Sequence, residues 1–143
     1  MDSSRAGRVV VFGATGYTGR LAVEALLERG LRPVLAGRDS GRLAGLAADL
    51  DGDLEVAVAD VSRPETVRAL LDAGDVLVTT VGPFAKWGDP AAEGAVGAGA
   101  HYIDSTGEPP FIRRMFERHG PSAALQDVGM LTAFGYDLSL IHI

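Results

Sequence analysis

Apolar residues gather along the chain in six short runs, separated by segments with helical spacing. The runs occupy residues 8–12, 33–36, 54–59, 76–80, 101–104 and 128–134. Short apolar runs that alternate with helical segments are typical of a parallel sheet built from strand–helix–strand units. The pattern therefore predicts an α/β fold: a doubly wound parallel six-stranded sheet with helices on both faces.

Five helices are expected between these runs. They lie at residues 16–29, 40–50, 62–74, 91–99 and 109–119. Gly30 provides the left-handed residue at which the first helix ends. In the third helix, Ser62 is expected to cap the N-terminus, Pro64 to occupy the first turn and Glu65 to complete a capping box. Glycines inside the fourth helix, such as Gly94, each cost about 1 kcal/mol, so we expect them where close packing on the sheet requires a small residue.

The composition limits the classes of protein and site that the chain can form. Its 143 residues suffice for a single domain, and the absence of cysteine excludes disulfides, thiolate zinc sites and a cysteine nucleophile. The net charge of −6 argues against nucleic acid as a partner, because nucleic-acid domains normally show a basic face. No apolar run reaches the roughly 20 residues needed to span a bilayer, so no transmembrane segment is expected. These features predict a soluble cytoplasmic protein.

The stretch VVVFGATGYTGR, residues 9–20, places three glycines after the first predicted strand and at the start of the first predicted helix. In a Rossmann sheet the first glycine permits a tight turn, the second lets the backbone approach a pyrophosphate, and the third lets helix and strand pack closely. Free N–H groups and the helix dipole favour phosphate there. The alternative is a glycine-rich turn without a ligand. The cofactor-binding residues predicted from this stretch are Gly13, Thr15, Gly16, Tyr17, Thr18 and Gly19.

The end of the second predicted strand indicates which cofactor is bound. An NAD site normally carries an acid there, about 20 residues beyond the loop, to hold the ribose 2′-hydroxyl. This chain instead has Gly37 followed by Arg38, a cation suited to a 2′-phosphate. We therefore predict NADP(H), with Arg42 as a second cation one helical turn further on. The alternative is that Arg38 is a solvated loop charge and that Asp39 caps the next helix.

The ends of two further strands are predicted to contact the cofactor. Asp60 follows the third strand, where the adenine end is expected, although an acid at this position is equally suited to cap the next helix. Val81, Gly82, Pro83 and Phe84 follow the fourth strand at the same edge of the sheet, which holds the ligand in open parallel sheets. Gly82 leaves room for the nicotinamide ribose beside the backbone; the alternative is an ordinary turn imposed by Gly82 and Pro83.

Five motifs together resemble a known family. They are GATGYTG at 13–19, AGR at 36–38, VGPF at 81–84, HYIDSTGE at 101–108 and FGYD at 134–137. By these motifs, nearly the whole chain resembles the N-terminal NADP-binding domain of saccharopine dehydrogenase-like oxidoreductases, especially their trans-acting enoyl reductase branch. The resemblance implies a further substrate domain after the sixth strand, with hydride transfer in the cleft between the two domains.

The resemblance also implies that the segment after the fifth strand faces the nicotinamide. Asp104, Thr106, Gly107 and Glu108 are therefore candidate cleft residues. The alternative is a strand-to-helix turn in which Glu108 favours the helix N-terminus. No catalytic acid or base is assigned from these residues.

Other chemistries find little support in the sequence. Short-chain dehydrogenases pair a tyrosine with a lysine four residues later, and no tyrosine stands four residues before Lys86, the only lysine. Reductases that share GATGYTG but form a thioester need a cysteine, which is absent. His101, His119 and His142 form no ligand cluster, so no metal site is expected, and His119 is expected in the last turn of a helix. Trp87 is a candidate for contact with substrate or for packing.

Three segments are expected along the chain: a disordered N-terminus at 1–7, an NADP-binding domain at 8–137 and a non-native tail at 138–143. The tail, LSLIHI, is the translation of a transposon end sequence used in DNA library preparation; a natural C-terminus is the alternative. On this hypothesis the chain is cut before its substrate domain, binds NADP(H) and is inactive alone. The alternative function is a self-contained NADP(H)-sensing regulatory module without catalysis, and a homo-oligomer is left open.

Overall fold

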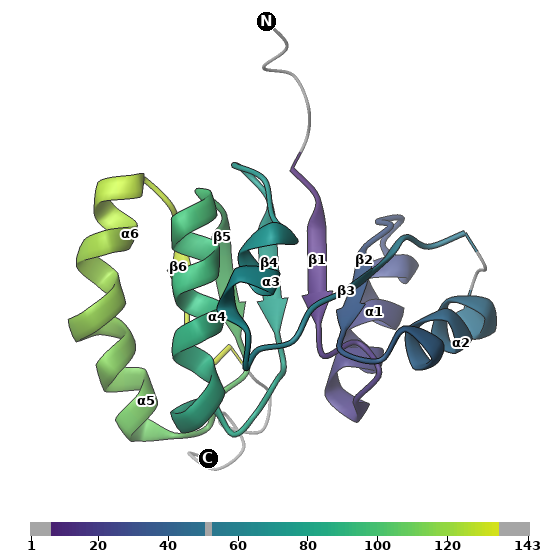
Figure 1. Ribbon diagram of the computed structural model, residues 1–143, viewed down its shortest axis with the longest axis horizontal. Coiled ribbons are helices and arrows are strands. Elements are labelled where there is room, and N and C mark those ends of the chain that lie inside the picture. The colour runs from purple at the N-terminus through teal and green to yellow at the C-terminus, as the bar shows by residue number, and fades with distance from the viewer. Residues whose placement is uncertain (1–6, 51–52, 135–143) are drawn as a thin grey trace, which may run out of the picture.

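The computed structural model describes residues 7–50 and 53–134 (Figure 1). The predicted tail at 138–143, most of the FGYD motif and all but the last residue of the predicted disordered N-terminus lie outside the described residues. The strands are β1 (Val9–Phe12), β2 (Val34–Gly37), β3 (Val56–Val58), β4 (Val76–Thr79), β5 (His101–Asp104) and β6 (Met130–Leu131). The helical segments are α1 (Tyr17–Glu28), α2 (Ser40–Leu50), α3 (Pro64–Ala69), α4 (Phe84–Ala98), α5 (Pro109–Arg114), the π-helical turn η1 (Met115–His119) and α6 (Gly120–Gln126).

Within these residues, the six strands form one parallel sheet in the order β3-β2-β1-β4-β5-β6. At its centre, Val11 of β1 pairs with Leu35 of β2 and with Val78 of β4. The chain builds outward from β1 to β3, returns to β4 beside β1, and then builds outward in the other direction to β6. The predicted doubly wound Rossmann sheet is therefore confirmed.

Helices cover both faces of the sheet, as predicted (Figure 1). Val23 of α1 and Leu43 of α2 pack in one core cluster with Val11. Ala91 of α4 packs in a second cluster with Val10, the neighbour of Val11 on β1. Because successive residues of a strand point to opposite faces, β1 is buried on both sides. This burial explains why its residues form a continuous apolar run rather than an alternating one.

The third helix begins differently from the prediction. Its N-terminal cap is Arg63, which makes no side-chain capping bond, and the helix ends at Ala69. The predicted cap by Ser62 is wrong, because the Ser62 hydroxyl donates instead to the Asp60 carboxylate at 2.7 Å. Glu65 forms an ion pair with Arg63 at 3.4 Å. The expected proline in the first turn, Pro64, is present.

Helix α4 begins earlier than predicted, at Phe84, and contains Pro90. Proline lacks the N–H that an interior helical position donates, so the helix is without one internal hydrogen bond at Pro90. Gly94 lies in close packing as expected, but against α3 rather than the sheet: a Cβ atom there would lie 3.1 Å from Cγ1 of Val67. The helix ends as typical helices do, at the left-handed Gly99.

The last helical segment is longer than predicted, and the last strand is shorter. Helix α5 continues through η1 into α6 and ends at Gln126 instead of residue 119. His119 is the last residue of η1, and the helical path continues from it into α6; its side chain is buried, and its ring lies 2.6 Å from the Asp89 carboxylate. β6 contains only two residues, Met130 and Leu131.

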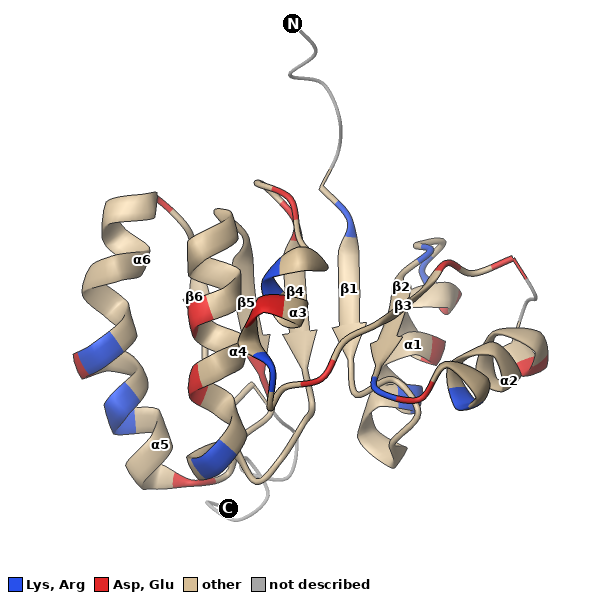
Figure 2. Ribbon diagram, viewed as in Figure 1, with Lys and Arg blue, Asp and Glu red and all other residues tan. Residues whose placement is uncertain are grey.

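Charged residues of both signs are interspersed over the described elements (Figure 2). None of the described helices is long and apolar enough to cross a bilayer. The interspersed charges leave individual arginines and backbone N–H groups, rather than a broad basic surface, as candidates to bind phosphate.

Candidate functional site

A cleft opens where β1, β2, β3 and β4 end. Its volume is about 550 Å³, within the range of roughly 300–1,000 Å³ that is typical of small-molecule sites. It lies beside the neighbouring strands β1 and β4, where the chain reverses direction in the sheet, the usual position of ligands in open parallel sheets. The lining residues are Phe12, Gly13, Thr15, Gly37, Arg38, Ala59, Asp60, Val61, Ser62, Val81, Gly82 and Trp87.

The glycine loop has the backbone geometry that its sequence predicts. Gly13 has a φ of +91°, a conformation that favours glycine, and a Cβ atom there would lie 2.7 Å from Oγ1 of Thr80. Its N–H donates to the carbonyl of Ala36 at 3.0 Å, which ties the turn to β2. A Cβ atom on Gly19 would overlap the Gly13 carbonyl. Gly19 therefore allows the close contact between α1 and the end of β1.

The N-terminus of α1 differs from those of two neighbouring helices at this edge. At the start of α1, Gly16 is the cap residue, no side chain caps the helix, and no acid lies in its first turn. In contrast, Asp39 accepts the Arg42 N–H at the start of α2 at 3.0 Å, and Glu108 accepts N–H groups at the start of α4. Because carboxylates already occupy those two positions, α1 is the helix of the three that best suits a bound phosphate.

Arg38 and Asp60 line the cleft on its β2–β3 side. Arg38 is exposed. Asp39 caps α2, so the part of the alternative prediction that assigned Asp39 to a helix cap is confirmed. Asp60 accepts both the N–H and the hydroxyl hydrogen of Ser62. These bonds, with smaller effects from Arg38 and Arg63, hold the pKa of Asp60 below its ordinary value of 3.8. The carboxylate is therefore ionised at neutral pH.

The other predicted cofactor residues lie around the cleft rather than in its lining. Tyr17 and Thr18 are exposed on the first turn of α1 beyond the glycine loop. Arg42 lines a separate hollow of about 260 Å³ between α1 and α2, which also contains Thr15. The structure thus brings together six of the thirteen predicted residues as lining: Gly13, Thr15, Arg38, Asp60, Val81 and Gly82. The remaining seven are Gly16, Tyr17, Thr18, Gly19, Arg42, Pro83 and Phe84.

The loop after β4 forms the opposite wall of the cleft. Val81 and Gly82 line it, whereas Phe84 is buried and its ring centre lies 5.8 Å from that of Phe111. Trp87, from the first part of α4, both lines the cleft and packs against the core. Nζ of Lys86 lies 4.7 Å from the centre of the Trp87 ring. The packing role that sequence reasoning left open for Trp87 is confirmed, and contact with substrate stays a prediction.

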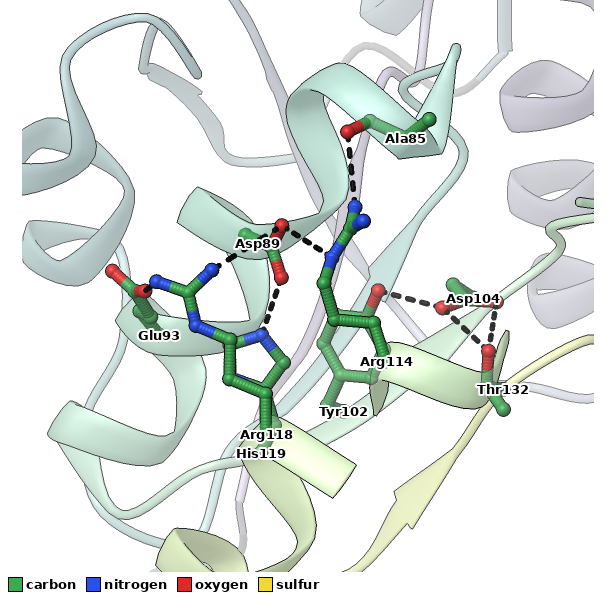
Figure 3. A network of polar contacts seen from close by, with 9 residues as sticks. All are labelled: Ala85, Asp89, Glu93, Tyr102, Asp104, Arg114, Arg118, His119 and Thr132. Carbon is green, nitrogen blue, oxygen red and sulfur yellow. Dashed lines mark hydrogen bonds and ion pairs between the residues drawn. The ribbon is translucent and has the colours of Figure 1, made fainter. Parts of the chain in front are cut away.

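The segment after β5 does not contribute to the lining of this cleft, and the expectation that it faces the nicotinamide in a cleft between two domains stays a prediction. Asp104 is buried and accepts hydrogen bonds from the Tyr102 and Thr132 hydroxyls (Figure 3). It also accepts the N–H groups of Thr106 and Ala133, so it fixes the ends of β5 and β6 together. Burial and the nearby Asp104 carboxylate raise the pKa of Tyr102 well above its ordinary value. Tyr102 therefore stays protonated as a hydrogen-bond donor.

Sequence reasoning did not predict all the residues that line the cleft. Ser62 was assigned to a helix cap, and no role was given to Ala59 or Val61, which also line the cleft. Their signal in the sequence is their position at the end of the third strand, beside Asp60. In an open parallel sheet the ligand lies at the carboxyl ends of the strands, beside the point where the strand order reverses.

Comparison with known proteins identifies the family. A family model described as NAD(P)H-binding matches residues 13–106, which is more than half of the chain. The chain belongs to this NAD(P)H-binding family. The match begins at Gly13 and ends at Thr106, so it contains the glycine loop and every residue that lines the cleft except Phe12. The prediction of a nicotinamide cofactor is confirmed at this level.

Curated relatives of this NAD(P)H-binding chain include trans-acting enoyl reductases. The one from Mycobacterium leprae is 38% identical over 134 residues, which cover 90% of this chain and 32% of the relative. The one from Mycobacterium bovis (strain BCG) is 37% identical with the same coverage. The chain thus spans about a third of the length of these relatives. Its predicted resemblance to this branch is confirmed.

Solved structures share the fold at low sequence identity. Saccharopine dehydrogenase (L-Glu forming) from Saccharomyces cerevisiae gives a TM-score of 0.75 at 14% identity, over 96% of this chain and 29% of that one. Citrobacter triphenylmethane reductase complexed with NADP(H) gives 0.65 at 20% identity, over 87% and 48%. The TrkA-N domain of inner membrane protein ybaL from Escherichia coli gives 0.65 at 11% identity, over 97% and 94%. These similarities support the Rossmann fold.

Proposed function

We propose that this NAD(P)H-binding chain prefers NADP(H) and is the cofactor-binding domain of an oxidoreductase similar to the trans-acting enoyl reductases. The observation that carries the preference is the end of β2, where exposed Arg38 lines the cleft and Asp39 is engaged at the start of α2. A guanidinium forms charge-assisted hydrogen bonds to phosphate, typically worth about 1.5–3 kcal/mol. NADH lacks the 2′-phosphate and so gains nothing from this arginine.

The geometry of the cleft supports one orientation of the bound cofactor. The pyrophosphate lies at Gly13 and the start of α1, where no carboxylate competes for the N–H groups. The adenine end lies toward Asp60 and the nicotinamide ribose toward Val81 and Gly82, which line opposite sides of the cleft. Arg42, on α2, is the second cation for the 2′-phosphate. The proposed contacts are Gly13, Thr15, Gly16, Tyr17, Thr18, Gly19, Arg38, Arg42, Asp60, Val81, Gly82, Pro83 and Phe84.

The proposed reaction of the whole protein is a reduction by hydride transfer. When bound, the nicotinamide supplies the hydride, and the described residues bind and orient it. The names of the relatives suggest an enoyl group, an activated alkene, as the substrate class. Binding without turnover by this chain alone, a cytoplasmic location and self-association stay predictions.

Calorimetric titration with NADPH and NADH tests the preference. We expect wild type to bind NADPH more tightly than NADH, by roughly tenfold or more for a bond of this strength. Arg38→Ala should remove most of that difference by weakening NADPH binding and leaving NADH binding nearly unchanged. Arg29→Ala is the matched control, because Arg29 is exposed at the opposite end of α1. Equal affinities of wild type for the two cofactors would contradict the proposal.

A further inference from the structure

Glu108 makes an unusual pair of contacts with a helix that begins 24 residues before it. Its Oε2 accepts the Phe84 N–H at 2.7 Å, and its Oε1 accepts the Ala85 N–H at 3.1 Å. These are the first two residues of α4, and no side chain of α4 itself caps that helix. Both oxygens of one carboxylate thus satisfy N–H groups that the helix leaves without an internal partner.

The main chain of Glu108 is also fixed by hydrogen bonds, and this fixes the position from which its carboxylate reaches α4. The Glu108 N–H donates to Oγ1 of Thr106 at 3.1 Å. Its carbonyl accepts the N–H groups of Phe111 and Ile112 at 3.0 and 3.1 Å, and Glu108 is the cap residue of α5. One residue therefore joins the start of α5 to the start of α4.

Arg114 reinforces the same junction from the outer side. Its Nη2 donates to the Ala85 carbonyl at 3.0 Å, and its Nε lies 2.9 Å from a carboxylate oxygen of Asp89 (Figure 3). The other oxygen of Asp89 lies 2.6 Å from the buried His119 ring. Helix α4 is thus held to the α5–η1 segment by polar contacts along its first two turns.

The start of α4 is also the end of the loop that forms one wall of the cleft. Pro83 caps α4, and Val81 and Gly82 immediately before it line the cleft together with Trp87. Glu108 does not line the cleft itself. Its two bonds hold the helix from which this wall extends.

We propose that Glu108 is a positioning residue that sets the nicotinamide-side wall of the cleft from outside it. The proposal rests on the proposed function, because it assumes that the Val81–Gly82 wall contacts the nicotinamide half. Loss of the carboxylate frees the start of α4 and lets this wall move, whereas the glycine loop and Arg38, on other elements, keep their geometry. The adenine half of the cofactor should therefore bind as before.

Titration with two ligands distinguishes a local effect of Glu108 on the nicotinamide-side wall from a general loss of cofactor binding. NADPH and adenosine 2′,5′-bisphosphate, which carries the adenine half and the 2′-phosphate, are titrated into wild type, Glu108→Ala and Glu108→Gln. We expect Glu108→Ala to bind NADPH roughly tenfold more weakly, because the wall at Val81 and Gly82 is no longer held in place, and the bisphosphate as tightly as wild type. Glu108→Gln keeps one acceptor oxygen and should lose less. Equal losses for both ligands, or no loss for either, would overturn the proposal.

A control variant and a cofactor-independent measurement complete the test. Glu117→Ala removes an exposed glutamate that pairs with Arg113 and should change neither affinity. Hydrogen exchange of the Phe84 and Ala85 amides should accelerate in Glu108→Ala but not in Glu117→Ala; unchanged exchange overturns the proposal. If wild type binds neither ligand, the proposed function fails, and the exchange rates still decide whether Glu108 holds α4.

Discussion

Three carboxylates, those of Asp75, Asp104 and Glu108, each join segments of the chain that are distant in sequence. Asp75, at the start of β4, accepts the N–H of Arg8 at 2.8 Å and a guanidinium hydrogen of the same residue at 3.0 Å. Asp104 joins β5 to β6, and Glu108 joins α5 to α4. Sequence reasoning could place these acids at strand ends but not assign their partners, because local spacing carries no signal for contacts across the sheet.

Asp75 gives a prediction for the pH dependence of stability. Its burial alone raises the pKa, but the N–H groups of Asp72 and Arg8 and the Arg8 guanidinium outweigh that effect and leave the pKa below 3.8. Since the folded pKa lies below the unfolded one, Asp75 stabilises the fold above about pH 4, and this contribution is lost as pH falls through the folded pKa. Asp75→Asn should lower the free energy of unfolding at pH 7 by about 1.5–3 kcal/mol.

Urea unfolding at pH 7 and pH 3 measures both effects for Asp75. The difference in the free energy of unfolding between wild type and Asp75→Asn should shrink at the lower pH. Asp53→Asn is the control, because Asp53 is exposed outside the helices and strands. A difference that stays constant between the two pH values would show that the ionised carboxylate contributes nothing specific.

At the scale of elements, prediction succeeded where the signal was local. The strand positions and the left-handed end of α1 at Gly30, with a φ of +81°, follow from residues within a few positions. The start of α4 was missed because the carboxylate that accepts its first two N–H groups comes from Glu108, which lies more than 20 residues further along the chain. The Ser62 cap was wrong because Asp60 competes for the hydroxyl. Helix boundaries that depend on hydrogen-bond partners distant in sequence cannot be predicted from local residue spacing.

The packing of α1 on β1 is tested by Gly19→Ala. A methyl group at this position overlaps the Gly13 carbonyl, so the helix must shift away from the strand. We expect a loss of roughly 1–3 kcal/mol in the free energy of unfolding, as for overpacking, together with weaker NADPH binding. Gly45→Ala is the matched control: nothing lies within 4 Å of its added methyl, and it should stabilise α2 by up to about 1 kcal/mol. Equal effects of the two substitutions on unfolding would contradict this account.

At the scale of the molecule, the sheet order brings the candidate site together. Because all strands run parallel, residues that follow β1, β2, β3 and β4 meet at one edge, although they span positions 13–87. This convergence could be predicted from the alternating pattern of strands and helices. The burial of Asp104 could not, because its partners Thr132 and Ala133 are distant in sequence.

The location of the cofactor is the central claim, and an amide chemical-shift titration of the wild-type chain with NADPH tests it most directly. The largest shifts should fall on Gly13 and Gly16 at the glycine loop, and on Gly82 at the opposite wall. The amide of Gly129, before β6 at the far edge of the sheet, should stay unchanged. Saturable chemical-shift changes at Gly13, Gly16 and Gly82, but not at Gly129, would support this location. Binding of NADPH that leaves the shifts of these three glycines unchanged would contradict it.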